Sequence, residues 1–256
     1  MRRVRVIPVL LLHKGGLVKS VRFKNYKYVG DPINAVKIFN EKEIDEIAVI
    51  DIDATREKRA VNIQKIKEIA GEAFIPLAYG GGISHINEVK ELFYIGVEKV
   101  VLNYNAVHKP ELITEAASLV GSQSVVVSID VKKNLFGKYQ VCINNASENT
   151  RLDPVAFAKK MQDVGAGEIF LNSVDKDGTY GGYDLELIKK VSSVLSIPLI
   201  ACGGAGNMDD FTGAVKNGAS AVAAGSMFVF QRPHQAVLIS YPGQQELKEK
   251  FFSKIE

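Results

Sequence analysis

The sequence predicts an α/β protein in which eight parallel strands, each followed by a helix, close into a barrel. Two observations predict this fold. Short runs rich in Val and Ile recur along the 256 residues and alternate with helix-period segments, as in a parallel sheet buried on both faces. The second half of the chain also repeats the first. Together they favour a (β/α)8, or TIM, barrel of two half-barrels.

The strand runs are continuous and short, and none has the character of an exposed edge strand, which a closed barrel explains. An open doubly wound sheet is the alternative. It requires a glycine fingerprint after the first strand, and "HKGGLVKS" does not fit that pattern. The eight runs span residues 4–12, 46–53, 75–81, 99–104, 124–130, 168–174, 197–204 and 221–228.

Two helix starts are marked by Asp-Pro pairs. Asp31 precedes Pro32, and Asp153 precedes Pro154, each at the head of a helix-period segment. An aspartate carboxylate caps the free N–H groups of a first turn, and proline tolerates the first helical position. We therefore predict helices that begin at both pairs and complete a βα unit.

The internal repeat has one constant offset. The motif "IPLAYGGGI" from Ile75 matches "IPLIACGGA" from Ile197, 122 residues later. Glu46 matches Glu168, and the segment from residue 96 matches the segment from residue 218, at the same offset. Three collinear matches indicate a duplication, and we predict one domain over residues 1–256 with half-barrels at about 1–120 and 121–256.

Composition excludes several classes of protein. With 46% hydrophobic and 24% charged residues and a net charge of +3, the chain is of ordinary globular type with no field that argues for nucleic acid. Basic residues gather between His13 and Lys27, which suits an anionic small molecule and predicts a mobile lid over it. The first apolar run lacks a cleavage site and is too short for a membrane.

Cysteine usage points to a reducing compartment. Cys142 and Cys202 are too few and too far apart for a disulfide framework or a zinc site. We expect buried free thiols, no metal, no membrane association and a cytoplasmic location.

Glycine clusters predict phosphate binding. Gly80 to Gly82 and Gly203-Gly204 each end a strand, and the next strands end in Asn103 and in Gly225-Ser226. Backbone N–H groups that glycine exposes bind phosphate oxygens well. Their symmetric occurrence predicts two phosphate sites across the barrel mouth, and a ligand with phosphate at both ends or one long enough to need two anchors.

Carboxylates also gather at strand ends, where an N-cap or a solvated loop is the alternative interpretation for Asp53 and Asp175. Asp51 and Asp130 each close an apolar strand, and we expect both to point into the top of the barrel. Desolvation there raises the pKa of a carboxyl and suits it to proton transfer.

Four charged residues stand at strand starts, at the opposite mouth. They are Arg5, Glu46, Lys99 and Glu168. Such charges often only solvate the rim. A charge-paired ring that acts as a gate is the other interpretation.

Across nearly the whole chain the sequence resembles the cyclase subunit of imidazole glycerol phosphate synthase, through "RVIPVLLLHKGGLVKS", "DEIAVIDIDATREKR", "IPLAYGGGI" and "GAGEIFLNSVDKDGTYGGYD". The resemblance implies a (β/α)8 barrel without a cofactor. It also implies a class I glutamine amidotransferase docked at the N-terminal mouth, whose ammonia passes through the barrel to the C-terminal mouth.

The resemblance also implies site residues. The four strand-start charges match the family's ammonia gate, and Asp130 matches one of its two catalytic aspartates. The other catalytic aspartate falls on Leu11, and the internal repeat gives the same alignment. Further departures are Lys14, Tyr104 and Cys202 in place of an acidic residue, a threonine and a serine. The implied phosphate contacts are Gly82, Asn103, Asp177, Gly178, Gly204, Gly225 and Ser226.

An intact gate beside Leu11 resembles paralogues of surface-polysaccharide biosynthesis, described as glycosyl amidation factors. This implies a phosphorylated or nucleotide-sugar ligand and a separate amidating enzyme as a further partner. A genuine cyclase subunit of histidine biosynthesis, which is a lyase, is the main alternative. A non-catalytic activator of the glutaminase is the third, and a related isomerase, for which the gate has no role, ranks last.

Overall fold

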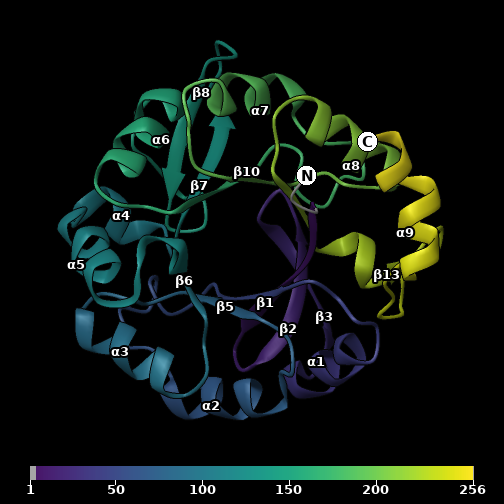
Figure 1. The fold of residues 1–256 in the computed structure, drawn as a ribbon, viewed down its shortest axis with the longest axis horizontal. Helices are drawn as coiled ribbons and strands as arrows, with labels where there is room; N and C mark the ends of the chain where they lie inside the picture. Colours follow the sequence, from purple (N-terminus) through teal and green to yellow (C-terminus); the bar gives the residue numbers. More distant parts are fainter. Residues whose placement is uncertain (1–3, 256) are drawn as a thin grey trace.

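A computed structural model describes residues 4–255 of the chain. Eight parallel strands form a closed ring, because β1 pairs with both β4 and β12, and β7 pairs with β10 (Figure 1). Each strand coincides with one of the eight runs, so the predicted barrel is confirmed. The barrel strands are β1 (Arg5–His13), β4 (Ile47–Asp51), β5 (Leu77–Gly80), β6 (Lys99–Leu102), β7 (Val125–Lys133), β10 (Glu168–Ser173), β11 (Leu199–Cys202) and β12 (Ala221–Ala224).

Helices surround the barrel on its outer side (Figure 1). Asp31 and Asp153 accept hydrogen bonds from two backbone N–H groups each in the first turns of α1 and α6, so both predicted caps are confirmed. The helices are α1 (Pro32–Asn40), α2 (Ile63–Glu72), α3 (Ile86–Tyr94), α4 (Tyr104–His108), α5 (Glu111–Val120), α6 (Pro154–Asp163), α7 (Leu185–Ser192), α8 (Met208–Lys216) and α9 (Gln244–Lys250).

Alternate residues of each strand divide the core into two parts. One face packs against the helices, as Val6 and Val49 do. The other face fills the barrel, where Leu11 and Ile50 pack on an apolar cluster. The period of two along a strand therefore decides which side chains can reach the pore. The interior cluster consists of Ile7, Val9, Ala48, Ala78, Val101, Val126, Phe170, Ile200, Cys202, Ala221 and Ala223.

Two smaller β units extend the barrel sheet, and a third forms a separate sheet. Strands β2 (Gly16–Val21) and β3 (Lys24–Gly30) form a hairpin that continues from β1. Strands β8 (Tyr139–Ile143) and β9 (Glu148–Asn149) continue from β7, and β13 (Phe230–Gln231) pairs with β14 (Ala236–Val237).

The β2–β3 hairpin is anchored to both half-barrels. The backbone N–H of Lys14 donates to Asp53 Oδ2 at 2.8 Å, and that of Arg22 donates to the carbonyl of Asp177 at 2.9 Å. These contacts hold the basic segment over the C-terminal mouth. Its mobility stays a prediction.

Both cysteines are buried and free, as expected. Between residues 4 and 255 the structure contains no helix with the length and apolar character to cross a membrane.

Candidate active site

A pocket opens at the carboxyl ends of the barrel strands, under the β2–β3 hairpin. Seven of the nine predicted catalytic and phosphate-site residues line it: Asp51, Asp130, Gly82, Asn103, Asp177, Gly225 and Ser226. Gly178 and Gly204 lie in adjacent loops and are not part of the wall. The sequence thus located the pocket, although the residues do not all contribute to it in the same way.

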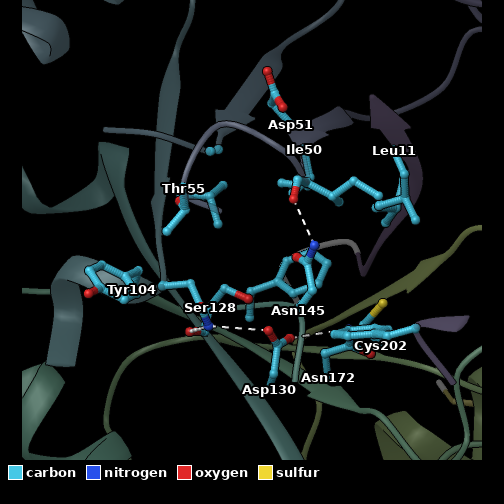
Figure 2. Close-up of a pocket in the computed structure, with 18 of the residues that line it drawn as sticks. Leu11, Ile50, Asp51, Thr55, Tyr104, Ser128, Asp130, Asn145, Asn172 and Cys202 are labelled. Atoms are coloured by element: carbon cyan, nitrogen blue, oxygen red, sulfur yellow. Dashed lines mark hydrogen bonds between the residues drawn. The ribbon is translucent and has the colours of Figure 1, made fainter. Parts of the chain in front are cut away.

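Asp130 is the carboxylate at the centre of this pocket. It comes from the inward face of β7, and the side-chain amides of Asn103 and Asn172 donate to its two oxygens at 3.3 and 3.4 Å (Figure 2). Burial raises the pKa of Asp130 to about 7, because the Asn172 hydrogen bond only partly opposes it and the charge of Asp177 adds to it. A carboxyl with this pKa can both donate and accept a proton near neutral pH.

Leu11 faces the same pocket from β1 (Figure 2). It pairs with Ile50 of β4, and both side chains pack on the interior cluster. A hydrocarbon side chain has no proton to exchange, so Leu11 leaves Asp130 without a second carboxyl on the wall formed by β1.

The expectation that Asp51 points into the barrel is wrong. Ile50 occupies the inward position of β4, so the next side chain turns to the outer face and points away from Asp130 (Figure 2). Arg59 Nη2 lies 2.9 and 2.8 Å from the two carboxylate oxygens of Asp51. The backbone N–H groups of Asp53 and Ala54 also donate to it, at 3.0 and 3.1 Å. Asp51 therefore holds the loop after β4, and these contacts argue against proton transfer.

Lys19 lines the pocket, although the sequence identified it only as a member of the basic segment between His13 and Lys27. Its side chain is 4% exposed, and Nζ donates to the carbonyl of Val9. Burial lowers the pKa of Lys19 to about 8, and the nearby Asp177 carboxylate opposes this change. Burial likewise raises the pKa of Asp177 to about 6, against the effect of the Lys19 charge. No alternation in β2 marks Lys19, because residues 17–20 are all buried, and its place in the pocket depends on the approach of the hairpin to the barrel.

Glycine is required at two of the predicted phosphate positions for close backbone approach. An added Cβ at Gly178 would lie 2.2 Å from the carbonyl oxygen of Ser20, and at Gly204 it would lie 2.2 Å from that of Gly182. Both residues have positive φ, +69° and +110°. Their conformation is therefore explained by packing, and a phosphate contact at either stays a prediction.

The four charged residues at the opposite mouth form a closed set of ion pairs, which we call the charge ring. Arg5 contacts the carboxylates of both Glu46 and Glu168. Lys99 Nζ lies 2.7 Å from Glu46 Oε2 and 3.0 Å from Glu168 Oε2. Both glutamates are almost fully buried. The ring is thus a structured layer across the N-terminal mouth of the barrel and not a set of independent rim charges.

A closed (β/α)8 barrel with a pocket at the carboxyl ends of the strands defines the class of TIM-barrel proteins that bind their ligands there. Residues 5–233 match the family described as "Histidine biosynthesis protein", and the chain belongs to this family.

Three relatives match nearly end to end. A "Putative imidazole glycerol phosphate synthase subunit HisF" of Leptospira interrogans is 44% identical over 98% of this chain and 100% of that protein. The corresponding putative subunit hisF2 of Pseudomonas aeruginosa is 48% identical over 96% and 99%. The putative subunit hisF3 of Vibrio vulnificus is 47% identical over 97% and 96%.

Proposed function

We propose that this chain is the barrel subunit of a glutamine-dependent synthase. It receives ammonia from a glutaminase docked at the N-terminal mouth and delivers it to the C-terminal pocket for amidation of a sugar. The carrying observation is the combination of a complete charge ring at one mouth with Leu11 opposite Asp130 at the other.

The barrel interior supports a conduit for a neutral molecule. Between the charge ring and Asp130 the interior is apolar, and alanines at positions 48, 78, 221 and 223 lie among larger side chains such as Ile7, Phe170 and Ile200. An apolar passage penalises ammonium strongly and ammonia much less, because an unpaired charge loses its hydration there. The ion pairs of the charge ring would have to separate for ammonia to enter this passage, and the charge ring would therefore act as a gate.

The pocket supports the loss of the cyclisation reaction that the cyclase subunit of imidazole glycerol phosphate synthase catalyses. Removing a general acid or base costs about 10²–10⁴ in rate, and Leu11 supplies neither. Two similar relatives have the numbered names hisF2 and hisF3, which fits further copies of the subunit.

The second candidate is a genuine cyclase subunit of histidine biosynthesis, favoured by the names of the relatives and by the retained Asp130. Complementation of a histidine auxotroph separates the two. We expect no growth with the natural chain. Growth would establish the cyclase and refute our preference. The variant Leu11→Asp, tested in parallel, shows how far that one residue accounts for the loss.

The coupled reaction tests the proposal directly. The barrel, a class I glutaminase subunit and a sugar-amidating enzyme are combined, and glutamate release and nitrogen transfer are measured together. We expect Lys99→Ala and Glu46→Ala to lower the ratio of transfer to hydrolysis, because the ring loses a member. Lys159→Ala, which removes an exposed helix ion pair, is the control. Hydrolysis without transfer in the natural complex would refute the proposal.

A third possibility, a barrel that only activates the glutaminase, predicts full output from Asp130→Asn in this assay. We expect a loss of at least tenfold, since the Asp130 carboxyl lies where the ligand binds.

A further inference from the structure

The pocket has two chemically different ends. We call the wall around Gly82, Asn103 and Tyr104 the first end, and the wall around Lys19 and Gly225 the second end. We propose that the pocket takes a ligand with a single anionic group, seated at the second end, and that the first end receives neutral hydroxyl or amide groups. This rests on the proposed function, which makes the ligand a sugar, and it replaces the sequence-based prediction of phosphate at both ends.

Two donors of the first end are already engaged by the protein. The backbone N–H of Gly82 donates to Thr55 Oγ1 at 3.3 Å. The side-chain amide of Asn103 donates to the carbonyl of Ser128 at 3.0 Å and to Asp130. The Gly82 N–H and the Asn103 side-chain amide, which were predicted to hold a phosphate here, therefore already donate to acceptors within the protein.

Two neighbouring asparagines present acceptors. Asn105 Nδ2 donates to the carbonyl of Ile83 at 2.6 Å, and Asn145 Nδ2 donates to that of Ile52 at 2.7 Å (Figure 2). These contacts fix the orientation of both amides, because an oxygen turned toward a carbonyl would be repelled. The remaining Oδ1 atoms accept hydrogen bonds. A phosphate dianion offers only acceptors, whereas sugar hydroxyl and acetamido groups also donate. The first end therefore matches neutral polar groups.

Tyr104 completes this end without adding a charge. Its ring lies against the His108 ring, with the centroids 4.4 Å apart. A flat aromatic surface beside amide oxygens suits the C–H and O–H groups of a sugar better than a phosphate.

The charge of the whole pocket allows for one anion. Within residues 4–255, Lys19 is the sole lysine or arginine in the pocket wall, against the carboxylates of Asp130, Asp177 and Asp51. The last of these is neutralised by Arg59 from outside the wall. A second phosphate at the first end would approach Asp130 with no cation beside it, which is unfavourable in a partly desolvated site.

The second end provides the cation. An added Cβ at Gly225 would lie 2.8 Å from Lys19 Nζ, so the absence of a side chain there makes room for the ammonium group. Nζ donates to the carbonyl of Val9, and its other N–H groups can serve a ligand. Asp177 partly balances its charge, which limits this end to one anionic group.

The test compares fructose 6-phosphate with fructose 1,6-bisphosphate by calorimetric titration of the full chain. We expect the bisphosphate to bind no more tightly than the monophosphate. Lys19→Met should weaken monophosphate binding at least tenfold, and Lys159→Met, at an exposed lysine of α6 outside the pocket wall, should leave it unchanged. Bisphosphate binding tenfold tighter than monophosphate binding would overturn the proposal, as would the absence of binding by both esters at millimolar concentration.

A gain-of-function variant provides an independent readout. Tyr104→Arg adds a cation to the first end and should shift the preference at least tenfold toward the bisphosphate. An unchanged ratio in a folded variant would overturn the assignment of the two ends. These titrations need neither a glutaminase nor an acceptor enzyme. A failure of nitrogen transfer in the coupled assay would therefore count against the proposed function and would not change the result of the binding titrations.

Discussion

Replacing Asp130 by Asn should stabilise the protein at high pH. Burial raises the pKa of this carboxyl from its ordinary 3.8 to about 7. For a group whose pKa is raised on folding, the stabilising contribution is complete below the unfolded value. It is lost as pH rises through the folded value. Asp130 therefore costs the natural protein stability as pH rises from about 4, fully so above about pH 7, and an uncharged amide does not.

The magnitude follows from the shift and the contacts. About three pKa units correspond to about 4 kcal/mol, and contact with pocket water reduces this to about 2–4 kcal/mol. The amide also retains a single acceptor for the two donors from Asn103 and Asn172, which costs about 1 kcal/mol at every pH. We expect Asp130→Asn to be less stable than the natural protein by about 1 kcal/mol near pH 4, and more stable by about 1–3 kcal/mol near pH 8.

Urea unfolding at the two pH values measures this difference. The control is Asp163→Asn, an exposed aspartate at the end of α6 that pairs with Lys159, for which we expect no pH-dependent change above about 0.5 kcal/mol. If the difference between Asp130→Asn and the natural protein were the same at both pH values, the account of Asp130 as a desolvated carboxyl would be refuted.

Three further changes test other parts of the structure. Arg59→Met should lower the free energy of unfolding by about 2 kcal/mol, because Asp51 loses its cation; equal urea midpoints would count against this ion pair. Gly178→Ala should cost at least about 2 kcal/mol and weaken sugar-phosphate binding, since Cβ would collide with the hairpin backbone; unchanged binding would contradict the close approach. Asp31→Ala and Asp153→Ala should each cost about 1 kcal/mol and lower the melting temperature by about 2–4 °C, and a null effect at both would show that the caps are dispensable.

The sequence predicted what depends on local pattern. The eight strands follow from Val and Ile runs, and the caps follow from two Asp-Pro pairs, because both signals act within a few residues. The error at Asp51 is one of register, since a shift of one residue reverses the face of a strand. Counting by twos from Glu46 reaches Ile50, and counting from Glu168 reaches Asn172. Residues two apart on a strand share one face, so the inward position of the charge-ring residues predicts an inward Ile50 and an outward Asp51.

The residues that remained hidden depend on contacts between distant segments. Lys19 reaches the pocket only because the hairpin folds back over the barrel, and the orientation of Asn145 depends on the carbonyl of Ile52. Neither is encoded within one element, so pattern alone had no means of placing them.

The seam between β1 and β12 joins residues 5–8 to residues 221–224. During translation the barrel therefore cannot close until most of the polypeptide has left the ribosome. Until then one edge of β1 has no strand to pair with. Until residue 168 has also been made, Arg5 lacks Glu168, the partner that balances its layer. The nascent chain thus carries surplus positive charge beside an open hydrogen-bonding edge, and charge of this kind discourages premature pairing with another molecule.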